Sequence, residues 1–211
     1  MNSDLALETQ HGSKVWLLVL IPGLIWGASF LFIAEGLQAI GPNGVAFVRI
    51  LIGFATLTLF PRAWQPIPRR EWGGVAVVGA LWMALPLTLF PHAEQHVSSA
   101  ITGMLNGSVP LFAALVATIH MRQPPSRPVL TGLIVGLAGA VLMALPTIHE
   151  GRNSTVGVLL ILAAVASYGI ALNVAGPLQR RNGALPIIWR AQGVALLLTA
   201  PLGVPELRAA H

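Results

Sequence analysis

The stretch VGVLLILAAVASYGIALNVAGPL, residues 156–178, contains no charged side chain. A helix rises about 1.5 Å per residue, so this stretch is long enough to cross the hydrocarbon core of a bilayer, which is about 30 Å thick. Six other mainly apolar stretches lie along the chain, and Pro, Gly, Asn or Ser punctuates the breaks between them. The sequence therefore predicts about seven transmembrane helices, at residues 16–37, 43–60, 72–91, 97–120, 128–146, 156–178 and 186–203.

The composition excludes most soluble classes of protein. Of the 211 residues, 55% are hydrophobic and 9% are charged, and the mean hydropathy is +0.76, whereas an ordinary soluble domain has about 25% charged residues. The basic residues are scattered between apolar runs, which argues against a nucleic-acid partner and favours the lipid bilayer. We therefore expect an all-α polytopic membrane helix bundle without a cofactor.

The distribution of Lys and Arg predicts the orientation, because cytoplasmic loops are enriched in them. Two basic residues, Arg152 and Arg208, fall on one side of the predicted membrane, and eight fall on the other. The eight are Lys14, Arg62, Arg69, Arg70, Arg122, Arg127, Arg180 and Arg181. This places residues 1–15 in the cytoplasm and residues 204–211 outside, in a plasma membrane or bacterial inner membrane.

The chain contains an internal repeat. Aromatic, Arg, Gly and Pro residues recur in the same order at offsets of 140–142 residues. The matching pairs are Trp26 with Tyr168, Arg49 with Arg190, Gly53 with Gly193, and Pro61 with Pro201. An odd number of helices separates the copies, so the second copy has the opposite orientation, as in many secondary transporters. We expect an inverted five-helix repeat with a first copy at 16–146 and an incomplete second copy at 156–203.

Several motifs give the chain a family resemblance. They are Trp26-Gly27-Ala28-Ser29-Phe30, Arg49 after Pro42, Ser99-Ala100, Pro110-Leu111-Phe112-Ala113 and the glycines Gly132, Gly136 and Gly139. In this order they resemble the ten-helix EamA-type branch of the drug/metabolite transporter superfamily over about residues 16–203. Gln123 stands where the family often has an acidic residue, and the chain ends after the seventh helix. We therefore expect the 211-residue chain alone not to transport.

Two arginines fall inside predicted spans. Arg49 is a candidate ligand for a substrate carboxylate or phosphate, because Arg is costly within a membrane and usually faces a cavity or a partner. The alternatives for Arg49 are that it extends to the membrane surface or binds backbone carbonyls. Arg190 is the matching candidate in the second copy, and the alternative for it is that it extends to the membrane surface.

Polar and aromatic residues provide further candidates for substrate binding. Ser99, Thr102 and Asn106 share one helix face, which either lines a substrate path or hydrogen-bonds another helix. Trp26 and Tyr168 either form the walls of a cavity for an organic substrate or are ordinary packing residues.

Two further sets of residues have expected roles. Ser29 and Asn173 would provide polar contacts beside the two aromatic residues. Gly132, Gly136 and Gly139 favour close helix packing, including packing in a possible homodimer.

Other chemistries receive little support from the sequence. The segment His92-Ala-Glu94-Gln-His96 lacks the spacing of a zinc-binding helix, so we interpret it as a solvated loop and expect no metal. The only lysine, Lys14, excludes a retinal Schiff base in a late helix.

The sequence thus predicts a transporter, not an enzyme, that exports a small organic metabolite such as an amino acid by alternating access. A non-transporting truncated membrane protein or assembly subunit is the alternative, and an intramembrane enzyme is the third reading.

Overall fold

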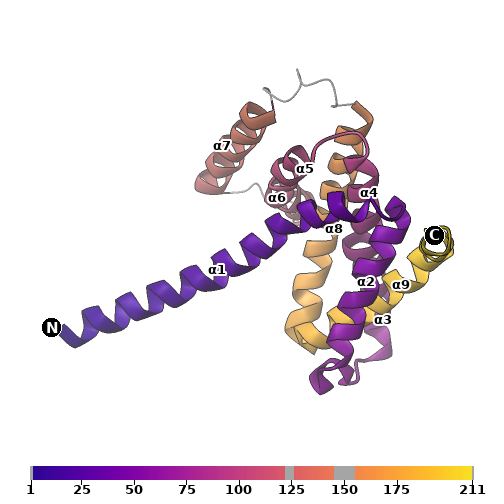
Figure 1. Ribbon diagram of the computed structural model, residues 1–211. Coiled ribbons are helices and arrows are strands. Elements are labelled where there is room, and N and C mark those ends of the chain that lie inside the picture. Colours follow the sequence, from indigo (N-terminus) through magenta and orange to yellow (C-terminus); the bar gives the residue numbers. More distant parts are fainter. Residues whose placement is uncertain (1, 122–125, 145–154, 211) are drawn as a thin grey trace.

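The computed structural model describes residues 2–121, 126–144 and 155–210, and these ranges contain helices and no strand. Figure 1 shows the arrangement. The elements are α1 (Asn2–Gly36), α2 (Pro42–Thr58), η1 (Pro61–Trp64), η2 (Arg69–Glu71), α3 (Trp72–Val78), η3 (Gly79–Ala84), α4 (Leu85–Glu94), α5 (Ser99–Asn106), α6 (Val109–Met121), α7 (Arg127–Ala144), α8 (Thr155–Asn182) and α9 (Ala184–Arg208).

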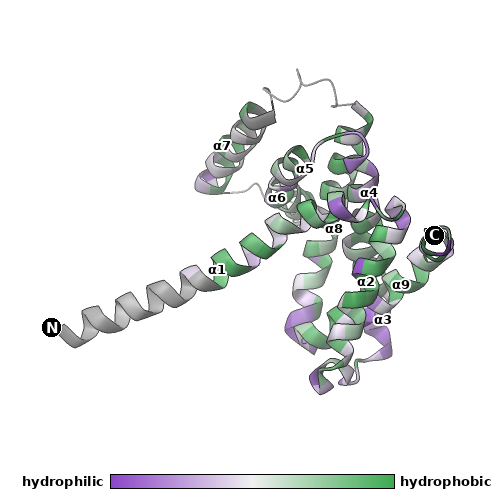
Figure 2. Ribbon diagram, in the orientation of Figure 1, coloured by the Kyte–Doolittle hydropathy of each residue, from purple (hydrophilic) through white to green (hydrophobic). Residues whose placement is uncertain are grey.

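These elements make seven helical rods in the described part of the chain, because α3, η3 and α4 are continuous and α6 follows α5 after a short break. Each predicted span lies largely within one rod, so the all-α membrane bundle is confirmed. Four rods are long and apolar enough to cross a membrane, and three shorter apolar helices accompany them. In Figure 2 hydrophobic residues follow α2 and α8, and hydrophilic residues gather towards the two ends of the bundle.

The helix ends differ from the predictions at three places. The α1 helix begins at Asn2 and not near residue 16. Pro91 lies inside α4, so the segment from His92 to Glu94 is the last turn of a helix and not a solvated loop. Pro201 lies inside α9 and does not end it, because a membrane helix tolerates a lost backbone hydrogen bond when its neighbours compensate.

The rod from α3 to α4 contains a π-helical segment, η3, at Gly79–Ala84. A π-turn is wider than an α-turn and is frequent at functional sites. This segment packs against α9. A Cβ on Gly79 would lie 2.7 Å from the carbonyl oxygen of Ala191, so glycine allows the two backbones to approach closely.

The α8 helix is the centre of the bundle and packs against α4 and α6. A core of buried apolar side chains joins α1, α4, α5 and α8, and includes Phe30, Ile33, Phe90, Ile161 and Tyr168. Only the end of α1 takes part, because its first half extends away from the bundle (Figure 1). The α7 helix lies at the margin of the bundle beside α5 and α6 and has few neighbours.

The α2 and α9 helices, which carry matching residues of the predicted repeat, pack against each other. They are antiparallel, and a Cβ on Gly53 would lie 2.8 Å from the Gln192 amide, while a Cβ on Gly193 would lie 3.3 Å from Phe54. Both glycines of this matching pair therefore lie at the contact between the two helices, and the inverted repeat itself stays a prediction.

The charged residues divide between the two ends of the bundle as the sequence suggests. At one end Arg181 donates two hydrogen bonds to Glu71, of 3.2 and 3.0 Å, and Arg70 lies 3.8 Å from the same carboxylate. At the other end Glu206 accepts a hydrogen bond of 2.8 Å from the backbone N–H of Gly44. Arg70 and Arg181, two of the basic residues predicted on one side, therefore lie together, and the assignment of that side to the cytoplasm stays a prediction.

Candidate functional site

Arg49 lies on α2, inside the apolar part of the bundle. Its Nη2 donates a hydrogen bond to the hydroxyl of Ser29 on α1. Its Nη1 is buried and has no hydrogen-bond partner among the residues that the structure describes. A guanidinium group has five N–H donors in a fixed plane, so Ser29 fixes one edge of the group and leaves a donor available for a ligand.

Aromatic rings lie next to this arginine. Trp26 on α1 and Tyr168 on α8 contact each other edge to face, with 6.3 Å between ring centroids. Tyr168 also lies 5.9 Å from Phe90, which lies 5.4 Å from Phe30. Tyr168 is 5% exposed, whereas Trp26 is 46% exposed. The structure thus brings the repeat-related pair together, with Tyr168 inside the bundle and Trp26 at its margin.

The position of Tyr168 depends on the glycine after it. A Cβ on Gly169 would lie 2.7 Å from the backbone carbon of Phe112, so α8 and α6 are in backbone contact here. Asn173, one turn further along α8, donates hydrogen bonds to the carbonyl oxygens of Ala113 and of Gly169, at 2.9 and 2.8 Å. Asn173 therefore fastens α8 to α6, and both contacts hold Tyr168 in place.

Glu94, the last residue of α4, lies in the same part of the molecule and was not among the predicted site residues. Its Oε2 accepts a hydrogen bond of 2.8 Å from Ser99, and its Oε1 is buried without a partner. The carboxylate lines a cavity of about 250 Å³ together with Ala34 and His96. Arg49 is close enough to interact electrostatically with both Glu94 and Tyr168.

Sequence reasoning missed Glu94 because the surrounding segment resembles a polar loop. Pro91 precedes it and two histidines flank it, which suggested solvent exposure. The available signal was the Ser98-Ser99 pair four residues later, since Ser is a preferred residue at a helix N-terminus. The Ser98 hydroxyl accepts a hydrogen bond from the Ile101 N–H, which starts α5 and brings Ser99 back towards the end of α4.

The three polar residues predicted to share a face of one helix differ in their surroundings. Ser99 contacts Glu94 as described. Thr102 is fully buried and donates a hydrogen bond of 3.2 Å to the carbonyl of Ser98 in its own helix. Asn106 is also buried, and its Oδ1 has no hydrogen-bond partner. Among the three, Ser99 lies closest to the charged residues, and Asn106 provides an unused acceptor.

Arg190 lies at the other end of the molecule and has different contacts from Arg49. Its Nη1 donates hydrogen bonds to the carbonyl oxygens of Ala63 and Pro186, at 3.3 and 3.0 Å. The guanidinium carbon lies 5.3 Å from the centre of the Trp189 ring. Arg190 thus braces backbone carbonyls between η1 and α9, a role that the sequence reasoning did not assign to it, and a role in substrate binding stays a prediction.

The glycines of α7 have no close neighbour in the described part of the chain. A Cβ on Gly132, Gly136 or Gly139 would meet nothing within 4 Å. Their predicted role in helix packing therefore has no contact to support it here and stays a prediction.

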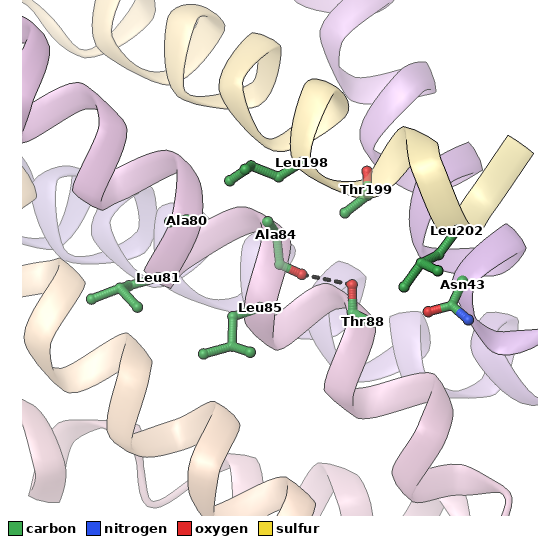
Figure 3. A pocket seen from close by; sticks show the side chains of 9 residues that line it. All are labelled: Asn43, Ala80, Leu81, Ala84, Leu85, Thr88, Leu198, Thr199 and Leu202. Carbon is green, nitrogen blue, oxygen red and sulfur yellow. Dashed lines mark hydrogen bonds between the residues drawn. The ribbon is translucent and has the colours of Figure 1, made fainter.

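A second cavity, of about 310 Å³, lies between α2, the η3–α4 part of the rod and α9 (Figure 3), and contains none of the predicted site residues. Thr88 in its wall donates to the carbonyl of Ala84, and Thr199 donates to the carbonyl of Ala195, each at 2.8 Å. Both hydroxyls thus use their proton within their own helix, and the remaining lining is almost entirely apolar. This cavity has little polar capacity for recognising a substrate.

A family model for EamA-like transporters matches residues 13–145 of this sequence, which is more than half of the chain. The chain belongs to the EamA-like transporter family. Membership places this EamA-like chain in the drug/metabolite transporter superfamily, whose members are multi-pass membrane proteins and generally not enzymes. No group of His, Cys, Asp and Glu suited to a metal ion occurs among the residues that the structure describes.

Relatives of this EamA-like chain occur in several bacteria. A protein of Streptantibioticus cattleyicolor named "probable terminal-alkyne amino-acid exporter" is 25% identical over 190 residues, which are 89% of this chain and 63% of that protein. The "uncharacterized transporter YdfC" of Bacillus subtilis is 25% identical over 78% of this chain and 54% of its own length. The "uncharacterized inner membrane transporter YedA" of Escherichia coli K12 is 26% identical over 88% of this chain and 61% of its own length.

The EamA-like chain therefore spans between about half and two thirds of the length of these relatives. No solved structure matches it significantly.

Proposed function

We propose that this EamA-like chain binds a small organic metabolite that carries a carboxylate, such as an amino acid, as part of an exporter that works by alternating access. The observation that carries the proposal is the buried Nη1 of Arg49, a donor without a hydrogen-bond partner among the described residues. A charged group inside a membrane protein is costly unless it has a partner, and such groups commonly mark substrate pathways. A carboxylate is the natural partner, because it accepts hydrogen bonds from the edge of a guanidinium group.

The surroundings of Arg49 suit a ligand with an apolar body. Trp26, Phe90 and Tyr168 form a group of aromatic rings, and Arg49 is close enough to Tyr168 to interact with it electrostatically. Binding pockets for small molecules typically combine such apolar walls with a few fixed polar groups. The name of the Streptantibioticus relative, an amino-acid exporter, adds support for this class of substrate.

The movement would be a rocking of one repeat against the other around this site. The glycine contacts between α2 and α9 allow the two copies to lie against each other closely, and no ion pair crosses that contact among the described residues. Rocking of inverted repeats about a fixed central site is a common transport mechanism.

The experiment is equilibrium binding of radiolabelled L-leucine and of 4-methylpentanoate, the same skeleton without the amino group, to the purified chain in nanodiscs. Arg49→Gln should weaken binding of both compounds by about 10-fold or more, the value of a hydrogen bond to a charged group. Arg49→Lys should restore little of it, because Lys lacks the planar set of donors.

Arg62→Gln is the matched control, because Arg62 is an exposed arginine of η1 at the opposite end of the bundle. It removes the same charge and should leave the affinity for both compounds unchanged. If the parent chain binds neither compound, or if Arg49→Gln folds and binds both like the parent, the proposed function is wrong.

A further inference from the structure

We infer that Glu94 is the residue that selects substrates carrying an ammonium group, so that Arg49 and Glu94 together recognise a zwitterion. The inference rests on the proposed function, since it assigns a second ligand to the same site.

The two charged residues are held in the same way. Ser29 accepts a hydrogen bond from Arg49, whose Nη1 has no partner among the described residues. Ser99 donates a hydrogen bond to Glu94, whose Oε1 likewise has no partner among them. Both vacant atoms are buried. In each charged group, one atom is hydrogen-bonded to a serine and another is buried without a hydrogen-bond partner. A buried atom of a charged group that lacks a partner costs free energy.

Arg49 and Glu94 do not form an ion pair with each other. Their charges interact through the interior, but the ion pairs formed by the described residues all involve Glu71 and none joins Arg49 to Glu94. Between α2 and the end of α4 the described residues thus leave a buried donor on one side and a buried acceptor on the other. A molecule with a carboxylate and an ammonium group would satisfy both sides at once.

Specificity follows from charge. A carboxylate without an amino group would satisfy Arg49 but leave Glu94 unpaired next to a second negative charge. An amine without a carboxylate would leave Arg49 unpaired. Because leaving a buried charged group without its partner is heavily penalised, the zwitterion should bind much more tightly than either partial analogue.

The test compares L-leucine, 4-methylpentanoate and 3-methylbutylamine, three compounds with the same branched skeleton, in the nanodisc binding assay. The parent chain should prefer leucine to 4-methylpentanoate by about 10- to 100-fold, the value of one hydrogen bond between charged groups. In Glu94→Gln, which keeps an acceptor for Ser99 but loses the charge, that preference should fall to within a few-fold of unity.

Two controls separate selection from folding. Glu35→Gln removes a carboxylate from the same end of α1, where Glu35 is exposed and contacts only Gln38, and should keep the preference of the parent. Glu94→Asp keeps the charge and should keep part of the preference. If Glu94→Gln does not fold, the preference measured on the parent still tests the inference.

The inference is overturned if the parent binds leucine and 4-methylpentanoate equally, or if Glu94→Gln weakens both equally. In either case the compounds still bind through Arg49 and the proposed function survives. Failure of both compounds to bind the parent would instead refute the proposed function itself.

Discussion

Replacement of Gly169 by alanine should destabilise the bundle, because α8 and α6 are in backbone contact at this residue. The new Cβ would lie 2.7 Å from the backbone carbon of Phe112 and 2.9 Å from its carbonyl oxygen. Ordinary contact begins near 3.4 Å, so the two helices would have to separate by about 0.7 Å. Backbone atoms cannot rotate out of the way as the end of a flexible side chain can.

The size of the effect follows from two opposing contributions. Overpacking of a well-filled interior costs about 1–3 kcal/mol, and alanine in place of glycine inside a helix recovers about 1 kcal/mol. Because the backbone atoms of Phe112 cannot move aside, the overpacking cost lies in the upper part of that range, about 2–3 kcal/mol, and the net loss is about 1–2 kcal/mol. In a protein of this size each kcal/mol lowers the melting temperature by about 2–4 °C, so Gly169→Ala should melt about 2–8 °C below the parent.

The assay is a thermal scan of the purified chain in detergent, followed by tryptophan fluorescence. Gly136→Ala on α7 is the matched control, since a Cβ there meets nothing within 4 Å, and it should melt at or above the temperature of the parent. A Gly169→Ala variant that melts no lower than the parent would refute the close approach of α8 and α6.

Three other predictions concern the two ends of the bundle. Single cysteines replacing Arg70 and Arg181 should react with an impermeant thiol reagent only after cells are permeabilised, whereas His96→Cys should react in intact cells; the reverse pattern would contradict the predicted orientation. Glu71→Arg should lower the melting temperature because it opposes Arg181, and the exchanged pair Glu71→Arg with Arg181→Glu should recover most of the loss; without recovery, the ion pair contributes nothing to stability. Glu206→Gln should lower the melting temperature by about 2–4 °C, because it removes about 1 kcal/mol of charge interaction with the N-terminus of α2; an unchanged melting temperature would show that this carboxylate has no such role.

The apolar stretches predicted the number and order of the helices because the bilayer imposes a minimum length on each span. The repeat also related Trp26 to Tyr168, and the structure places the two rings in contact, while their role in substrate binding stays a prediction. The same reasoning gave Arg49 and Arg190 equivalent roles, and there it was incomplete. Arg190 contacts the carbonyl of Ala63 in η1, whereas Arg49 contacts a serine hydroxyl on α1.

The position of Glu94 depends on backbone geometry that the sequence pattern does not reveal. A proline normally disfavours helix interior positions, so Pro91 suggested that the helix ends there. The structure continues the helix for three more residues past Pro91, and this last turn carries the carboxylate to Ser99. The difference between a solvated loop and a buried site thus lies in a single helical turn.

The π-turn in the rod from α3 to α4 holds about one residue more than an α-helical turn would. An α-helix advances about 100° per residue, so a return of Gly79–Ala84 to α geometry would turn α4 by about that angle around its own axis relative to α3. Glu94, at the far end of the rod, would turn with α4, and so would Phe90 and Ala93, which are buried in the core around α8. The π-turn therefore sets which side of α4 faces α8 and where Glu94 lies relative to Arg49.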